Sequence, residues 1–256
     1  MTRACSVAVA LALGLLACAC AWAQAPKRSG FDALSPSLQA MQRDDAQNPG
    51  MLWVADGELL WRTSAPGAQA CSDCHGPVAQ SMAGVAARYP DWDAAERRPI
   101  DLAQRINACR TRHQRGSAWP AESQELLGLE AYVARASRGR PLAPSRAPEL
   151  AAARAEGERL YHQRLGQLNL ACTQCHDELP GRKLGGTPIP QGHVNGYPLY
   201  RLEWQSLGSL RRRIRNCMSG VRAEAFGFDA PEMIALEAYL AQRSAGLMVE
   251  APAVRP

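Results

Sequence analysis

The stretch CSDCH at residues 71–75 recurs as CTQCH at residues 172–176. C-x-x-C-H is the attachment signature of c-type haem, because two thiols at this spacing can form thioethers with the haem vinyl groups and the adjacent histidine can bind the iron. Two copies therefore predict two covalently bound haem c groups. The residues expected to hold them are Cys71, Cys74 and His75 in the first copy and Cys172, Cys175 and His176 in the second.

Other uses of these cysteines have weaker support. Three disulfides are the default for the six cysteines that follow residue 23 in an exported protein. A zinc site would need four clustered nitrogen and sulfur ligands, and a thioredoxin-like CxxC would need a strand before it and a helix after it. Two CxxCH motifs in one exported chain rarely arise by accident, so haem attachment is the preferred interpretation.

The two motifs lie inside a longer internal repeat. The matched segments, in chain order, are GELLW and GERLY at Gly57 and Gly157, INAC and IRNC ending at Cys109 and Cys217, and LEAYVA and LEAYLA at Leu129 and Leu236. Each half thus has a helix, a haem motif, a long loop, a helix with one cysteine and a closing amphipathic helix. This is the order of a class I cytochrome c domain. We expect a mainly α fold of two tandem class I cytochrome c-type domains, each with one covalently bound haem.

The first 23 residues have the pattern of a leader. A short positive start, an apolar run and an A-x-A site predict a cleaved signal peptide over residues 1–23 and a periplasmic location. A lipobox ending at Cys18, and hence a lipoprotein, is the minor alternative. No later stretch reaches the roughly 18 apolar residues that a membrane span needs, so no membrane span is expected.

The rest of the chain divides at a proline-rich linker. Residues 137–150 carry this linker, which places the boundary near residue 145 and gives an N-terminal domain over 24–145 and a C-terminal domain over 146–256. We also expect a short helix near residues 36–43. The proline-containing tail after Ala245 is expected to be loose.

Composition narrows the class of partner. The chain carries a formal net charge of +5, a mild basicity that favours anionic partners or substrates. It has no lysine-rich tract and no alternation of aromatic and basic residues of the kind that binds single strands, so no nucleic acid partner is expected. Aromatic residues make up only 6% of the chain, and a large apolar haem in each half would supply the core that they do not.

The second axial ligands are less certain from the sequence. Cys109 and Cys217 are the only candidates at matching positions in both halves, and each ends a Leu-Ile-Cys stripe with helical i, i+4, i+7 spacing. This predicts thiolate ligation of both irons. The open alternatives are a buried cysteine without a ligand role, a Cys109–Cys217 disulfide, and methionine or histidine ligation. The latter would draw on Met82, His113, His193, Met218 or Met233.

Arginine distinguishes the two copies. Arg105 and Arg213 each precede the matched cysteine by four residues, so each shares a helix face with a thiol whose ionised form it would favour. Only the second copy adds three more arginines, which indicates that its site works on an anion. Arg211 and Arg212 lie away from the apolar stripe and are expected on a solvated basic face.

These features together resemble a known family. The two CxxCH motifs, the single cysteine after each, and the RxxxC element before LEAYLA are similar to the SoxA family, the dihaem catalytic subunits of the SoxAX cytochromes of periplasmic thiosulfate oxidation. The resemblance covers essentially the whole mature chain. Its specific part is RxxxC with its continuation CMSGVRAEAF, because many cytochromes share the CxxCH motifs alone.

The resemblance implies a reaction and roles for residues. It implies an L-cysteine S-thiosulfotransferase that joins thiosulfate oxidatively to a cysteine of the carrier protein SoxYZ and passes two electrons to an external cytochrome c. Cys109 and Cys217 would be the distal haem ligands, and Cys217 would also be the catalytic residue, carried as a persulfide. Arg213 would bind the anionic substrate. A small monohaem cytochrome, SoxX, would be the stable partner in a heterodimer.

Two other functions fit a dihaem chain. A plain electron-transfer cytochrome without a catalytic role predicts methionine or histidine as the distal ligand of both irons. A dihaem peroxidase predicts an open iron site that reacts with peroxide. The identity of the distal ligands therefore decides between these classes.

Overall fold

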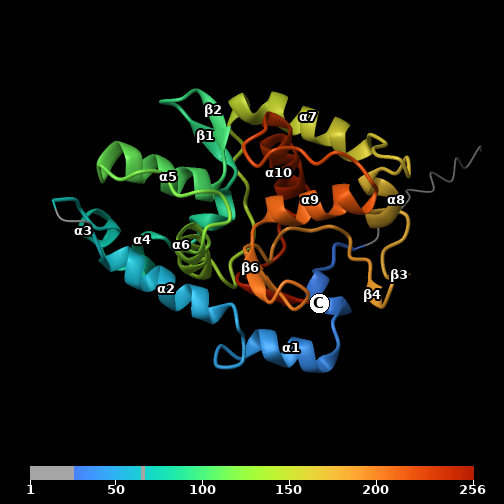
Figure 1. Cartoon of the computed structure of the whole chain (residues 1–256), viewed down its shortest axis with the longest axis horizontal. Helices are drawn as coiled ribbons and strands as arrows, with labels where there is room; N and C mark the ends of the chain where they lie inside the picture. Colours follow the sequence, from blue (N-terminus) through green and yellow to red (C-terminus); the bar gives the residue numbers. More distant parts are fainter. Residues whose placement is uncertain (1–25, 65–66) are drawn as a thin grey trace, which may run out of the picture.

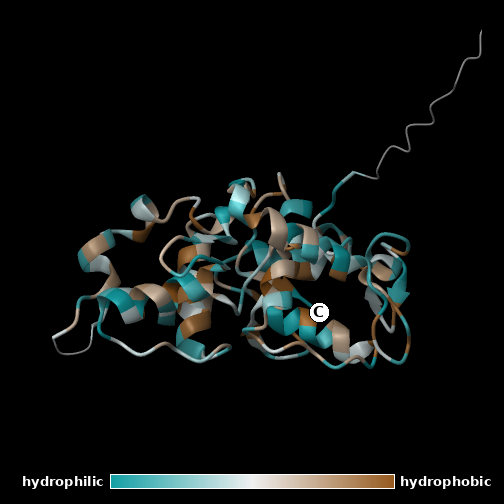
Figure 2. Ribbon diagram, turned by 90° about the horizontal axis from the view of Figure 1, so that it is seen from above, coloured by the Kyte–Doolittle hydropathy of each residue, from teal (hydrophilic) through white to brown (hydrophobic). Residues whose placement is uncertain are grey.

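The structure is a computed structural model that describes residues 26–64 and 67–256. The predicted leader and its lipobox alternative lie outside the described residues. Helices dominate the described part, as the repeat predicts, and no helix in it is long and apolar enough to cross a membrane. Apolar and hydrophilic stretches alternate along the helices of both halves, as Figure 2 shows.

The two halves lie side by side (Figure 1). They share the order of long helix, short CxxCH helix, hairpin, cysteine-bearing helix and closing helix, but after the CxxCH helix the first half adds a short helix and the second adds a short hairpin. The first half contains α2 (Met51–Arg62), α3 (Cys71–His75), α4 (Val78–Ser81), β1 (Asp91–Asp93), β2 (Arg98–Ile100), α5 (Leu102–His113) and α6 (Gln124–Arg135). The second contains α7 (Ala151–His162), α8 (Cys172–His176), β3 (Lys183–Leu184), β4 (Thr187–Pro188), β5 (Leu199–Arg201), β6 (Ser206–Gly208), α9 (Leu210–Gly220) and α10 (Pro231–Arg243). Two terminal elements complete the fold, α1 (Pro36–Arg43) and β7 (Ala253–Arg255).

In each half the first and last long helices cross at a glycine. A Cβ added to Gly57 of α2 would lie 2.1 Å from the carbonyl oxygen of Gly128 in α6, and one added to Gly157 of α7 would lie 2.0 Å from that of Ala235 in α10. Such distances leave no room for a side chain, so the glycines at the start of each repeat permit the close approach of the two backbones. The crossing places both helices beside the haem motif of their own half.

A short antiparallel hairpin leads into the cysteine-bearing helix of each half. The hairpin β1–β2 precedes α5, and β5–β6 precedes α9. The helices begin at hydrogen-bonding caps: the side chain of Asp101 accepts from the Gln104 amide at 2.6 Å, and that of Ser209 accepts from the Arg212 amide at 3.1 Å. These caps set where each helix starts, and hence which face carries its cysteine.

The C-terminal tail differs from the expectation of a loose end. The amides of Gly139 and Leu142 donate to the carbonyls of Val249 and Leu247, and β7 then pairs in parallel with β5. Ala251, Ala253 and Val254 are fully buried. The prediction was wrong because the partners of the tail lie far away in the sequence, where local composition gives no sign of them.

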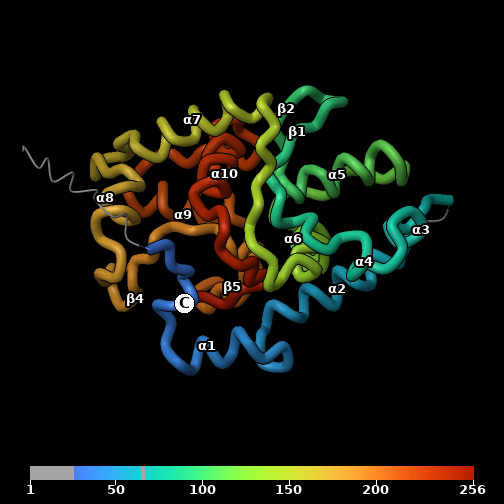
Figure 3. Tube along the Cα trace, turned by 180° about the vertical axis from the view of Figure 1, so that it is seen from behind, coloured from blue at the N-terminus to red at the C-terminus, as the bar shows by residue number. Residues whose placement is uncertain are grey.

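The N-terminal segment packs on this tail. Helix α1 forms over residues 36–43, as predicted, and lies beside the chain end in Figures 1 and 3. The Gln42 side chain accepts from the Val254 amide at 3.0 Å, and the Asn48 amide group donates to the Pro252 carbonyl at 2.9 Å. Residues 26–50 therefore contact the second half, although the domain boundary near residue 145 would place them in the first. That boundary stays a prediction.

A buried arginine joins the two halves. Arg211 of α9 is 5% exposed; its Nε and Nη2 lie 3.0 and 2.9 Å from Glu237 Oε2, and its Nη2 lies 2.7 Å from Asp101 Oδ2. Asp101 belongs to the first half, so one guanidinium binds carboxylates of both halves. The expectation that Arg211 lies on a solvated face is wrong, because these acids come from distant parts of the chain. Arg212 is partly exposed and lies over the Trp204 ring.

A cavity of about 540 Å³ lies at this interface. It is lined by both halves, and Glu130 and Glu237, from matching positions of LEAYVA and LEAYLA, both face it. Among the described residues, Glu130 Oε2 is buried without a hydrogen-bond partner. Burial, and then the negative charges of Asp101 and Glu237, raise the pKa of Glu130 well above 4.5. The interface therefore holds a carboxyl group that favours its protonated form.

Candidate functional site

Both CxxCH motifs form single helical turns. In α3 the amide of Ala70 donates to Asp73 at 2.8 Å, and in α8 the amide of Ala171 donates to Gln174 at 2.8 Å. The third residue of each turn thus caps the turn's own start, and this places the two cysteines, three residues apart, on one face. One residue between the cysteines therefore stabilises the start of its own helical turn, a role that the CxxCH motif alone does not indicate.

The second site gathers residues from α8, α9 and the loop between them. His176 Nδ1 lies 2.7 Å from the carbonyl oxygen of Pro190, and the ring lies close enough to Cys217 to lower the pKa of its thiol. A backbone carbonyl on Nδ1 selects the tautomer whose Nε2 is free to bind a metal. Gly192 lies against the ring: a Cβ there would be 3.0 Å from His176 Cγ, and its φ is +74°. The loop therefore holds the ring of His176 in place.

The charges around Cys217 favour its thiolate. Burial raises the pKa of this thiol, but the neighbouring His176 and the positive charges of Arg213 and Arg201 outweigh burial, so its pKa lies below 9.0. The pKa of Cys109 is instead raised by burial, and the negative charge of Asp93 opposes its neighbouring arginines. The matched cysteines thus occupy different electrostatic environments.

The first site has the same parts in a more exposed setting. Cys71 packs into an apolar cluster with Val78, Met82 and Ile106. The indole of Trp61 donates to the Gly76 carbonyl at 3.0 Å, and its ring centre lies 5.7 Å from that of His75. Cys109 of α5 lies close enough to both cysteines of the motif that its charge raises the pKa of Cys71 and the charge of Cys74 raises the pKa of Cys109. The predicted ligands of each haem therefore come together within their own half.

The arginines of α9 have separate partners. Arg211 binds Glu237 and Asp101, Arg212 donates to Ser206, and Arg215 donates to the Phe226 carbonyl. Arg213 alone among them has no ion pair and no side-chain hydrogen bond within the described part of the chain. An unpaired guanidinium near an ionisable thiol is what an anion site requires.

The methionine and histidine residues considered as alternative haem ligands differ in burial and in surroundings. Met233 is fully buried and Met218 is 6% exposed, whereas His113 is exposed at the end of α5. Met82 belongs to the apolar cluster of the first site, and His193 Nε2 lies 3.2 Å from Gln191 Oε1. All six described cysteines are free, so the Cys109–Cys217 disulfide and the three-disulfide default are wrong. No cluster that could hold a metal ion such as zinc occurs among residues 26–64 and 67–256.

The residues fit covalently bound haem c. In both halves the first cysteine of the motif packs against apolar side chains, including Ile106 in the first and Ile214 in the second. In the second half the histidine has its Nδ1 occupied by a backbone carbonyl, as metal-binding histidines usually do. Apolar walls, paired thiols and an oriented imidazole are together the donor set of a c-type haem site.

Comparison with known proteins agrees with this chemistry. The family model described as "SoxA/TsdA, cytochrome c domain" matches residues 56–142 and 156–249. The chain belongs to the SoxA/TsdA family. Each matched segment contains one CxxCH motif, and a protein of this family carries covalently bound haem c.

Curated relatives and a solved structure place the chain with SoxA. It is 34% identical to the "L-cysteine S-thiosulfotransferase subunit SoxA" of Rhodovulum sulfidophilum, and 37% identical to the protein of that name from Pseudaminobacter salicylatoxidans; each match covers 89% of this chain and 80% of the relative. A chain of the "Crystal structure of SoxXA from P. pantotrophus" is 30% identical, with a TM-score of 0.85 over 90% of this chain and 87% of that chain. These SoxA relatives support a role in thiosulfate oxidation.

The sequence did not indicate three residues near the second site of this SoxA-family chain. Tyr197, Arg201 and Arg255 line, with Arg213, a cleft of about 100 Å³. Burial raises the pKa of Tyr197 to about 12, although Arg213, Arg255 and Arg201 act against this rise, so its hydroxyl lies near all three cations. Arg255 comes from the last strand, 38 residues after Cys217, and no local pattern links the two. A signal for Arg201 was available in the internal repeat, where an acid occupies the matching position of the first half.

Proposed function

We propose that this chain is the catalytic subunit of a periplasmic haem enzyme, an L-cysteine S-thiosulfotransferase of sulfur oxidation that joins thiosulfate to a cysteine of the SoxYZ carrier protein. The outer sulfur of thiosulfate forms an S–S bond with the carrier sulfur, the carrier thiol loses its proton, and two electrons pass to cytochrome c. A SoxX-like monohaem cytochrome is the heterodimer partner, and the similarity to a chain of the SoxXA crystal structure supports this assignment.

One observation carries the proposal. Cys217, whose pKa is lowered, lies beside His176 and near the unpaired cation Arg213, in a chain whose relatives are named L-cysteine S-thiosulfotransferase subunits. In this proposal Cys217 is the catalytic residue and carries a persulfide intermediate. Arg213 attracts and orients the thiosulfate dianion, because a guanidinium forms paired, charge-assisted hydrogen bonds with such oxyanions.

The haem assignments complete the proposal. Cys71 and Cys74 would hold one haem c covalently, with His75 and Cys109 as ligands of its iron, and Cys172 and Cys175 would hold the other, with His176 and Cys217. Haem c supplies one-electron redox chemistry, whereas S–S bond formation releases two electrons. Two haems in this chain and one in the partner would accommodate both.

The test compares Cys217→Ala with Asn216→Ala, an exposed neighbour on the same helix, both in the complex with the monohaem partner. We expect Cys217→Ala to abolish thiosulfate-dependent reduction of cytochrome c in the presence of SoxYZ and to alter the electron paramagnetic resonance signal of one haem. Asn216→Ala should keep both. Full activity and an unchanged spectrum in Cys217→Ala would overturn the assignment of Cys217 as catalytic residue and haem ligand. A native protein without thiosulfate-dependent activity, whose spectrum is unchanged by Cys217→Ala, would instead be a plain electron-transfer cytochrome.

Intact mass gives a second, independent check. The mature chain should carry the mass of two haems, and the peptide that contains Cys217 should carry one additional sulfur atom. A mass with a single haem would contradict the dihaem assignment. Absence of the extra sulfur from active, freshly isolated enzyme would contradict the persulfide.

A further inference from the structure

The two halves can be compared residue by residue around the matched cysteines. Adding 108 to a residue number in this part of the first half gives the matching residue in the second half. Tyr89, Asp101 and Cys109 thus match Tyr197, Ser209 and Cys217. The hairpins agree with this offset, since Asp93 pairs with Arg98 in β1–β2 as Arg201 pairs with Ser206 in β5–β6. The same offset relates Asp93 to Arg201 and Arg105 to Arg213. One position thus has opposite charges in the two halves.

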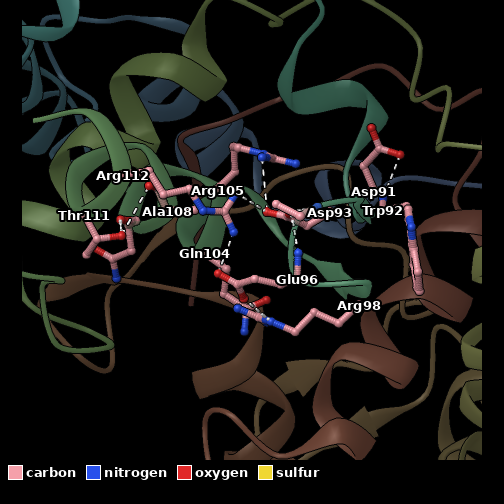
Figure 4. Close-up of polar contacts among 12 residues, drawn as sticks. Asp91, Trp92, Asp93, Glu96, Arg98, Gln104, Arg105, Ala108, Thr111 and Arg112 are labelled. Carbon is pink, nitrogen blue, oxygen red and sulfur yellow. Dashed lines mark hydrogen bonds and ion pairs between the residues drawn. The ribbon is translucent and has the colours of Figure 1, made fainter.

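In the first half the residue at this position, Asp93, neutralises Arg105, the arginine four residues before Cys109. Asp93 is 1% exposed, and its Oδ2 lies 3.2 Å from Arg105 Nη1 and 2.8 Å from Arg112 Nη1 (Figure 4). The hydrogen bond from Arg112 and the charge of Arg105 hold the pKa of Asp93 below 3.8 against the effect of burial. Arg105 is therefore paired with an acid of its own half, and the arrangement has no need of an external anion.

In the second half the acid is replaced by a second cation. Arg201 lies where the counterpart of Asp93 would be, and Arg213, the counterpart of Arg105, has no acidic partner among residues 26–64 and 67–256. The Nε of Arg201 is buried without a hydrogen-bond partner in the described chain, and its Nη2 lies 2.7 Å from Glu203, whose side chain is 61% exposed. Two neighbouring guanidinium groups repel each other unless an anion lies between them.

We propose that Arg201 is a second anion-binding residue of the Cys217 site and that it binds, with Arg213, the sulfonate end of a doubly charged sulfur oxyanion. Replacing the internal carboxylate of the repeat with arginine turns a closed ion pair into a site for an external dianion. Both residues line the same cleft beside Tyr197, whose hydroxyl is a further donor. That the anion is thiosulfate rests on the proposed function, whereas the two-arginine site does not.

The charge arrangement also assigns a role to Glu203. This exposed carboxylate competes with the anion for Arg201, so it weakens binding without closing the site. An exposed ion pair contributes at most about 1 kcal/mol, so Glu203→Gln should tighten anion binding by up to about fivefold. A purely structural role for Arg201 predicts no such gain.

The experiment measures thiosulfate binding to the haem-loaded heterodimer by calorimetry, without SoxYZ and without an electron acceptor. We expect Arg201→Gln to weaken binding about 10- to 100-fold, the effect of losing charge-assisted hydrogen bonds. Arg201→Lys should restore part of the loss, and Arg201→Asp, which recreates the first-half arrangement, should abolish measurable binding. Each variant must keep the absorption spectrum of both haems.

A matched control comes from the other hairpin. Arg97 is exposed in the β1–β2 turn, and its counterpart in the repeat is already glutamine, Gln205, with nearly the same positive φ of about 50°. Arg97→Gln should therefore leave binding unchanged. The proposal is overturned if Arg201→Gln binds thiosulfate within twofold of the native protein, or if Glu203→Gln binds it more weakly than the native protein. Binding that depends on Arg201, without transfer to SoxYZ by the native enzyme, would retain this site and refute the proposed function.

Discussion

Single residues of α9 show how far a local pattern can be trusted. The helical spacing placed Cys217 on one stripe with Leu210 and Ile214, but it did not separate this stripe from Arg211, which is buried as well. It could not assign the arginines of this helix, because the partners of Arg211 are Asp101, 110 positions earlier, and Glu237 on the next helix. Pairing between residues so far apart in the sequence depends on how the two halves pack, and hydrophobic periodicity gives no information about that packing.

Replacing Arg211 should destabilise the contact between the two halves. Arg211→Ala removes the only cation that contacts Glu237 among the described residues and leaves the buried carboxyl group of Glu237 without its hydrogen bonds and Asp101 without its ion pair. We expect a loss of about 3–5 kcal/mol in the free energy of unfolding, measured by denaturant titration. Arg212→Ala, from a partly exposed neighbour, should cost about 1 kcal/mol or less. Equal losses of unfolding free energy in the two variants would show that the buried contacts of Arg211 do not contribute more to stability than the surface contacts of Arg212.

Gly192 gives a second prediction. Its φ of +74° and the 3.0 Å distance from an added Cβ to His176 Cγ both exclude a side chain. Gly192→Ala should therefore cost about 1–3 kcal/mol of stability and turn the His176 ring, which would shift the absorption spectrum of the second haem only. The control is Gly186→Ala in the same loop, where an added Cβ meets nothing within 4 Å and φ is not positive. If both variants have native spectra, the loop does not position the ring.

Helices and strands were predictable to different degrees. The repeat predicted the order of the long helices in both halves, because each combines an amphipathic pattern with a recognisable landmark. It did not predict the strands, which are only two or three residues long and form too few alternations to be detected. Strand β7 shows the same limit, since Ala253 pairs with Leu199, far back in the chain.

The crossing of the long helices gives a third prediction. An alanine at Gly57 or Gly157 gains roughly 1 kcal/mol of helix propensity, but its Cβ would lie about 2 Å from a backbone oxygen of the partner helix, which cannot rotate away. Overpacking should win, with a net loss of about 1–3 kcal/mol and a lower melting temperature. Gly220→Ala on α9, where a Cβ meets nothing within 4 Å, should not destabilise the protein. Stable variants at both crossings would contradict this packing.

At the scale of the whole molecule, the interface between the halves should respond to pH. Burial raises the pKa of Glu237 to about 8, with Arg211 acting against it, and raises that of Glu130 well above 4.5. The folded state thus holds protons that the unfolded state releases near pH 4.5, so the stability from these groups is lost as pH rises toward and through 8. Three further groups face Glu130: the carboxyl groups of Asp101 and Glu122 raise its pKa, and Arg211 lowers it.

Glu130→Gln tests this pH dependence. The variant keeps a polar side chain but cannot ionise, so its melting temperature should fall less than that of the native protein between pH 5 and pH 8. At pH 8 it should be more stable by about 1–3 kcal/mol. Glu158→Gln, at an exposed residue of α7, should follow the native curve. Parallel curves for Glu130→Gln and the native protein would show that the proton is not held at this interface.

The buried chain end has a consequence for biosynthesis. The last strand lies against the first helix, through a hydrogen bond between residues 212 positions apart, and the tail before it completes an apolar cluster with Ala87, Ala134 and Leu142 of the first half and the linker. The ribosome makes these residues after both haem-motif segments and all the long helices. A polypeptide truncated before residue 247 lacks both strand β7 and the cluster residues Val249 and Ala251. Its first helix and its linker therefore have no partner to pack on, and these segments stay open to proteases.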